Sequence, residues 1–105
     1  MSAVVRHVVL VRFAAGIDPG EIAAIFRELA GLKDHVEGML DFQAGPNVSP
    51  EGMGRGYGHA FMVDFADVAA RDRYLADEGH ARAGARLTAA EGGRDGLLVF
   101  DLLLS

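Results

Sequence analysis

The sequence contains no cysteine, which excludes disulfide bonds, thiolate nucleophiles, iron–sulfur clusters and zinc sites with thiolate ligands. It has no apolar run close to the roughly 20 residues that a membrane-spanning helix needs, so we expect no membrane partner. The first residues carry Arg6 and His7 inside an apolar run and show no small-residue cleavage site, unlike a signal peptide. We therefore expect a cytoplasmic protein.

An excess of positive charge is also missing. The chain has 10 lysine and arginine residues against 15 aspartate and glutamate residues, which gives a formal net charge of −5. Its arginines are scattered, so the chain should repel phosphate backbones and we expect no nucleic-acid partner. Half of the 105 residues are apolar, which is enough to bury a core, and residues 1–105 are expected to form a single domain.

Apolar residues that alternate or run together predict four strands. The first and third strands place one histidine each, His7 and His59, on an otherwise apolar face that we expect to turn towards the helices. The last strand is apolar on both faces except for Asp101. The four predicted strands cover residues 4–13, 39–44, 59–65 and 97–104.

Capping residues predict where the helices begin. Asp18 as N-cap, Pro19 at the first helical position and Glu21 in a capping box start one helix, whose apolar stripe continues until Gly38. Asp67 caps a second helix. The segment 77–79 interrupts it, and a short helical piece follows from His80 to about Ala90. The stretch 48–58 carries Pro50 and four glycines and therefore reads as a loop. It lacks the spacing and the lysine of a phosphate-binding loop.

The order strand–helix–strand–strand–helix–strand is typical of an α+β fold in which a four-stranded antiparallel sheet carries both helices on one face. The opposite face would then present Val8, Leu10, Met62 and Leu98 to water. Soluble monomers rarely tolerate an apolar patch of that size. A second copy packed against this face by a two-fold axis is the commonest solution, so we expect a homodimer through the sheet face.

Three stretches, His7–Phe13, Asn47–Ala60 and Leu98–Asp101, together resemble the stress-responsive dimeric α/β-barrel family. The resemblance runs from about His7 to Asp101. It implies a ferredoxin-like protomer whose sheet joins that of a partner face to face, forming a dimeric α/β barrel.

One branch of that family, the polyketide cyclases, closes linear polyketides by intramolecular aldol chemistry without a cofactor. Resemblance to this branch implies that His80 and Tyr74 are catalytic and that His7 and His59 line the pocket. The chain departs from the family's usual His-Pro-x-His pattern, because it has Asp-Glu-Gly-His at 77–80. The residues implied for the apolar lining of the pocket are Val11, Ile25, Phe26, Phe61, Leu97 and Val99.

The chemistry of these side chains leaves alternatives open. His80 at a helix break can accept a proton from a carbon acid, and Tyr74 can orient it or donate a hydrogen bond to a developing enolate oxygen. In the alternative, both side chains are structural: Tyr74 is a core aromatic and His80 is a solvated helix start. His7 and His59 should lie near one another, either as a structural pair bonded to the backbone or a carboxylate, or as pocket residues.

No metal and no other cofactor is expected, because the histidine spacings match no ligand motif and a third ligand for His7 and His59 is not evident. The resemblance adds only that some family members hold a divalent ion near the dimer interface. Three functions follow as hypotheses: a pocket protein for a small, largely apolar oxygenated molecule with cyclase-like or lyase-like chemistry, a non-enzymatic stress-associated binding protein, and a cofactor-free monooxygenase.

Overall fold

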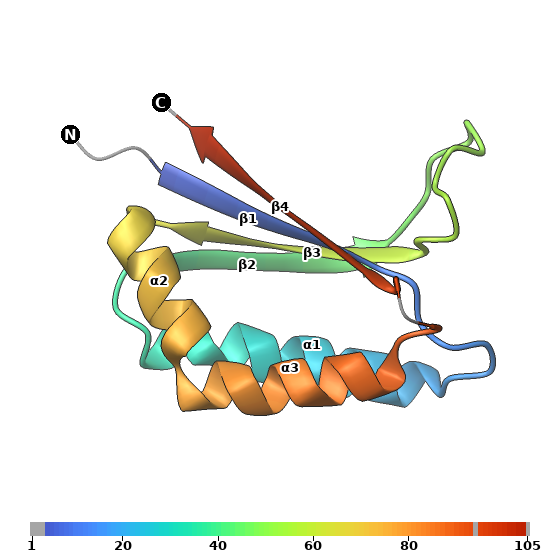
Figure 1. Cartoon of the computed structure of the whole chain (residues 1–105), viewed down its shortest axis with the longest axis horizontal. Helices are drawn as coiled ribbons and strands as arrows, with labels where there is room; N and C mark the ends of the chain where they lie inside the picture. Colours follow the sequence, from blue (N-terminus) through green and yellow to red (C-terminus); the bar gives the residue numbers. More distant parts are fainter. Residues whose placement is uncertain (1–3, 94, 105) are drawn as a thin grey trace.

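The structure is a computed structural model that describes residues 4–93 and 95–104. Four strands form one antiparallel sheet in the order β2-β3-β1-β4, and the helices lie on one face of it (Figure 1). The predicted α+β fold is therefore confirmed. In chain order the elements are β1 (Val4–Val11), α1 (Pro19–Gly31), the short 3₁₀ helix η1 (Leu32–Asp34), β2 (Met39–Pro46), β3 (His59–Phe65), α2 (Val68–Ala76), α3 (Glu78–Ala90) and β4 (Leu97–Leu104).

The third and fourth strands have the predicted bounds, whereas the first two differ at their ends. β1 stops at Val11, two residues early, because both of its partner strands end opposite this residue, β3 at His59 and β4 at Leu97. Phe13 forms only an isolated bridge to Glu91. β2 continues two residues beyond the prediction, to Pro46.

The first helix begins as predicted and ends earlier. Asp18 caps it by accepting a hydrogen bond from the Gly20 N–H (2.8 Å), and Pro19 is its first residue. The carboxylate of Glu21 pairs with Arg86 of α3 (2.6 Å) instead of closing a capping box. The predicted continuation to Gly38 is wrong, because α1 ends at Gly31 and the chain tightens into η1.

Asp67 caps α2 as predicted, accepting from the Ala70 N–H (2.9 Å). The predicted three-residue interruption is only one residue long: Asp77 has an extended backbone, ends α2 and caps α3. Since α3 starts at Glu78, His80 lies inside its first turn and does not begin the helix.

The hydrophobic core fills the space between the sheet and the helices, with Val5, Val9 and Val11 of β1 facing Ile25 and Leu29 of α1. The open face of the sheet is apolar, and the 47–58 loop projects on that side (Figure 1). On the open face, the most exposed large side chains of β4 are Leu98, Phe100 and Leu102, which are 44%, 57% and 40% exposed.

One charged pair interrupts the open face. Arg6 and Asp64 are cross-strand partners on β1 and β3, and the Arg6 Nε donates to a carboxylate oxygen of Asp64 at 2.8 Å. Among the described residues, no helix is both long enough and apolar enough to cross a membrane.

Candidate functional site

A pair formed by a buried histidine and a partly buried carboxylate joins the first and last strands. The register of β1 and β4 places His7 opposite Asp101, and Nδ1 of His7 lies 2.7 Å from Oδ1 of Asp101. The guanidinium of Arg71, on α2, donates to the other carboxylate oxygen at 2.8 Å. Burial of Asp101 favours a raised carboxyl pKa, but the hydrogen bonds from His7 and Arg71 outweigh it and lower the pKa overall. An ionised carboxylate only accepts, so Nδ1 of His7 carries the proton and Nε2 faces away from Asp101.

The ring of Tyr74 lies close to the rings of both His7 and His80. Its ring centroid is 5.8 Å from that of His7 and 4.5 Å from that of His80. The side chain is fully buried, and its hydroxyl oxygen has no hydrogen-bond partner among the described residues. Burial raises the pKa of the phenol well above its ordinary value, so Tyr74 stays a protonated donor. A buried donor without a partner is rare in proteins and marks this position as a candidate for ligand binding.

The imidazole of His80 is half-buried and favours its uncharged form. Its pKa is lowered, chiefly because burial disfavours the charged form and secondly because a charge on His7 repels it. The neutral ring therefore dominates at physiological pH and has a free lone pair. Together, His80, Tyr74, His7 and Asp101 form what we call the polar cluster, between the sheet and the junction of α2 and α3.

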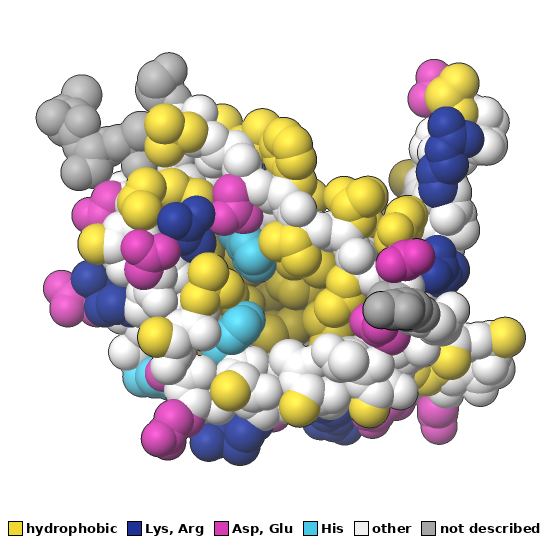
Figure 2. All heavy atoms as spheres, in the orientation of Figure 1, with side chains coloured by type: hydrophobic (Ala, Val, Ile, Leu, Met, Phe, Trp, Pro, Cys, Tyr) yellow, Lys and Arg dark blue, Asp and Glu magenta, His cyan; other side chains and the backbone are white. Residues whose placement is uncertain are grey.

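The molecular surface is hollowed between the sheet and α3 (Figure 2). Figure 2 shows this hollow between the sheet and α3, with a floor of hydrophobic side chains and two histidine side chains at one end. α3 packs mainly against α1 and α2, and between its two ends it carries alanine and glycine at positions 79, 81, 83, 84, 85 and 89. Small side chains do not reach the sheet, so Val99 and Leu103 on the helix-facing side of β4 stay 57% and 69% exposed.

His59 lies outside the polar cluster, contrary to the expectation that it neighbours His7. His7 is the cross-strand partner of Val63 and His59 that of Val11, so the two histidines are separated by roughly 13 Å along the strands at the usual rise per residue. The His59 ring packs instead against Phe13, at 5.2 Å between centroids.

The six residues expected to line the pocket divide into two groups. Val11 and Ile25 are fully buried and Phe61 is 3% exposed, so these three belong to the packed core. Phe26 and Leu97 are partly buried at its edge and Val99 is exposed. Only the second group is therefore accessible from solvent.

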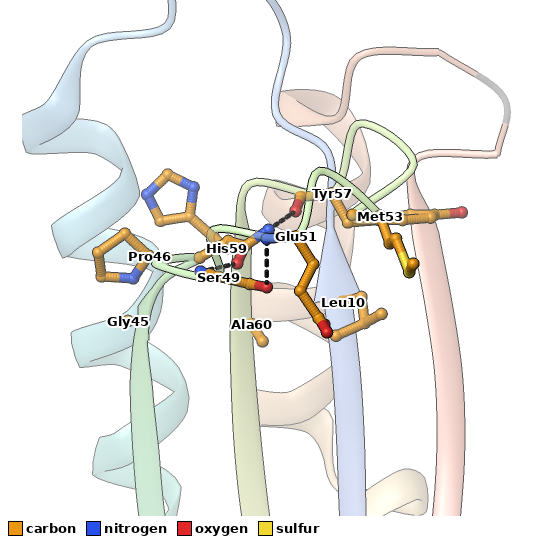
Figure 3. A pocket seen from close by; sticks show the side chains of 11 residues that line it. Leu10, Gly45, Pro46, Ser49, Glu51, Met53, Tyr57, His59 and Ala60 are labelled. Atoms are coloured by element: carbon orange, nitrogen blue, oxygen red, sulfur yellow. Dashed lines mark hydrogen bonds between the residues drawn. The ribbon is translucent and has the colours of Figure 1, made fainter.

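A second concavity, with a volume of about 290 Å³, lies under the 47–58 loop at the edge of the open face. Leu10, Glu51 and Met53 point into it, whereas the His59 ring turns away from it (Figure 3). It belongs to the face that we expect a second copy to cover. Among residues 4–93 and 95–104, no group of three or more histidine, aspartate or glutamate side chains is placed to hold a metal ion.

Sequence reasoning missed the roles of Asp101, Arg71 and Asp77. The signal for Asp101 was present: it is the one polar residue of an otherwise apolar last strand, and a buried polar group must be paired. His7 is the matching exception on the first strand's helix-facing side. Arg71 and Asp77 carried no such signal, because charged residues on helices usually face solvent.

The sheet, the helices on one face and the buried polar cluster define a ferredoxin-like α+β protein with a candidate site between its layers. The stress responsive A/B barrel domain matches residues 5–102, and the chain belongs to this family. It is 33% identical over 97 residues to the Arabidopsis thaliana stress-response A/B barrel domain-containing protein HS1, covering 92% of this chain and 86% of that protein.

Two solved structures place the fold further. A dimeric ferredoxin-like protein of unknown function from Jannaschia sp. CCS1 is 32% identical, with a TM-score of 0.79 over 96% of this chain and 99% of that one. The hydroxynitrile lyase of Passiflora edulis has a TM-score of 0.86 over 100% and 96% of the two chains. Its identity is 19%, so it shows likeness of fold alone.

The lowered pKa of His80 predicts a pH dependence of stability. Because the folded-state pKa lies below the ordinary value of 6.5, the contribution of neutral His80 is complete above about pH 6.5 and is lost as the pH falls through the folded-state value. We expect the stability difference between wild type and His80→Gln to shrink between about pH 7.5 and about pH 5. Urea unfolding of both proteins at the two pH values measures it, and an unchanged difference would contradict the burial of this imidazole.

Proposed function

We propose that this chain binds a small, largely apolar, oxygenated molecule in the hollow between the sheet and α3, and that the polar cluster performs cofactor-free proton-transfer chemistry of the aldol or lyase type. The observation that carries the proposal is the Tyr74 hydroxyl, which has no hydrogen-bond partner within the described part of the chain and is buried beside the neutral imidazole of His80. A donor and a base at one end of an apolar hollow are what binding and enolisation of a carbonyl compound require.

Each member of the cluster has a role in this proposal. His80 takes a proton from the carbon next to a carbonyl group, and the electron pair moves onto the carbonyl oxygen. The Tyr74 hydroxyl donates a hydrogen bond to that oxygen as its negative charge develops. His7, held by Asp101 through Nδ1, offers Nε2 to a second polar group of the ligand. Arg71 keeps Asp101 ionised and in place.

The relatives support this reading in a limited way. The Passiflora edulis structure is a hydroxynitrile lyase, so the same fold is compatible with lyase chemistry on small molecules. No residue role is transferred from it, because roles depend on the site and not on the fold.

We further propose that the functional unit is a homodimer joined through the open sheet face. On that face of β4, Leu98, Phe100 and Leu102 are 40–57% exposed in the single chain, which is more than a soluble monomer usually shows in one patch. The similar Jannaschia protein is described as dimeric. In such a dimer the second copy covers the concavity under the 47–58 loop.

A thermal-shift screen with β-diketones, β-polyketones and phenolic ketones tests the binding step, because a molecule that binds only the folded state raises Tm by an amount that grows with the ratio of its concentration to its Kd. Tyr74→Phe sharpens the test. Removing a buried hydroxyl that has no partner should raise the free energy of unfolding by about 1 kcal/mol, while the Tm shift caused by the ligand should shrink. If both proteins respond equally to every ligand, the Tyr74 hydroxyl plays no part in binding.

The competing function is a non-enzymatic binding protein in which the cluster is structural. It is favoured by the burial of His7, which is only 5% exposed. Ligand stabilisation without turnover, together with Tyr74→Phe behaving like the wild type, would support it.

A further inference from the structure

Asp77 connects η1 to the start of α3. Its Oδ2 accepts the backbone N–H of His80 at 3.2 Å and so caps the helix. Both of its carboxylate oxygens also lie within hydrogen-bond distance of Nε2 of His35, at 2.9 and 3.0 Å. His35 follows η1 directly and is the residue that ends it. A single carboxylate thus joins His35 to the backbone of His80.

The same junction is closely packed around Gly79. A Cβ atom at this position would lie 2.7 Å from Leu32 Cδ2 of η1 and 2.8 Å from the Asp77 carboxylate. No side chain fits at such distances without moving its neighbours. Only glycine therefore lets the first turn of α3 approach η1 closely enough for the bond between His35 and Asp77.

We propose that His35 is a positioning residue that fixes His80 in the polar cluster by holding the Asp77 cap. His80 is the third residue after Asp77, and its ring packs on Tyr74 with 4.5 Å between centroids. The hydrogen bond from His35 is the main reason why the carboxyl pKa of Asp77 lies below its ordinary value. The inference rests on the proposed function for the importance of His80, although its test needs no ligand.

The side chain of His35 is 55% exposed, so its removal should not disturb the core. In His35→Ala, Asp77 loses its side-chain donor and the first turn of α3 loosens. The His80 ring then gains water, and its pKa, followed by NMR of the ring protons, should rise towards the ordinary value by roughly 0.3 unit or more. Amide exchange of residues 80–83 should accelerate about tenfold.

Two further variants separate positioning from general damage. His35→Gln retains an N–H donor at similar reach and should restore both the His80 titration and the slow exchange. Lys33→Ala, an exposed change on η1 itself, should leave both unchanged. Gly79→Ala should reproduce the His35→Ala shift by a different route, because its methyl group pushes α3 away from η1.

An unchanged His80 titration in His35→Ala would overturn the inference, as would a His35→Gln variant that behaves like His35→Ala. These readouts are independent of ligand. If the His80 titration responds as expected but no ligand is found, the positioning role stands and the proposed function fails. If ligands bind and Tyr74→Phe weakens their binding, while His35→Ala leaves the His80 titration unchanged, the proposed function stands and the positioning role fails.

Discussion

Replacing Leu98 by aspartate is expected to abolish the proposed homodimer. Leu98 lies on the open face opposite Leu10 of β1, and a carboxylate placed there would be buried against the second copy without a partner. An unpaired buried charge costs several kcal/mol, and a two-fold interface counts it twice, so the dissociation constant should rise by about 100-fold or more. Light scattering over a micromolar concentration series measures the change.

The site of this substitution matters. Leu102 is a poorer choice, since its cross-strand partner is Arg6, which would pair with a new carboxylate. Val68→Asp is the matched control, because Val68 is 45% exposed against 44% for Leu98 and belongs to the first turn of α2. Acidic residues are tolerated near a helix N-terminus, so this variant should stay dimeric. A dimer of unchanged stability in Leu98→Asp would place the interface elsewhere.

Replacing His80 by alanine is expected to lower turnover of any substrate found in the ligand screen by about 10²-fold or more, the usual contribution of a positioned general base. The effect should appear in kcat, since the apolar part of the hollow still binds the molecule. The half-buried position of His80 means that the fold should persist, which circular dichroism and the unfolding midpoint check.

Arg82→Ala is the matched control for this experiment, because Arg82 is exposed and lies on α3 two residues after His80. It should leave turnover at the wild-type level. Equal turnover by wild type and His80→Ala would remove His80 from the chemistry and leave the binding-protein function. A large loss in both variants would point to damage of α3 as a whole.

Local sequence signals predicted most of the fold. The strands His59–Phe65 and Leu97–Leu104 and the caps Asp18 and Asp67 all agree with the structure. These features depend on neighbours within a few residues: alternation of side chains along a strand, or a carboxylate next to free backbone N–H groups. The end of α1 was harder, because an apolar stripe does not distinguish an α-helix from the 3₁₀ turn that follows it.

The candidate site was predicted only in part, because its geometry depends on contacts between distant segments. Tyr74 and His80 came from resemblance, and the structure places their rings together. The sequence put His7 and His59 on one face, yet alternation fixes only the face and not the position along the strand. The register of β1 and β3 separates them. Register follows from which strands pair and how, and that is a property of the whole sheet.

By itself the sequence determined the α+β class, the apolar open face from which we expect a second copy, and the presence of isolated polar residues in apolar strands. Periodicity and composition are enough for these, since burial depends on the period of apolar residues. Only the tertiary structure decided which groups those polar residues meet. His7 and Asp101 are 94 positions apart, and they pair because β4 returns beside β1 at the edge of the sheet.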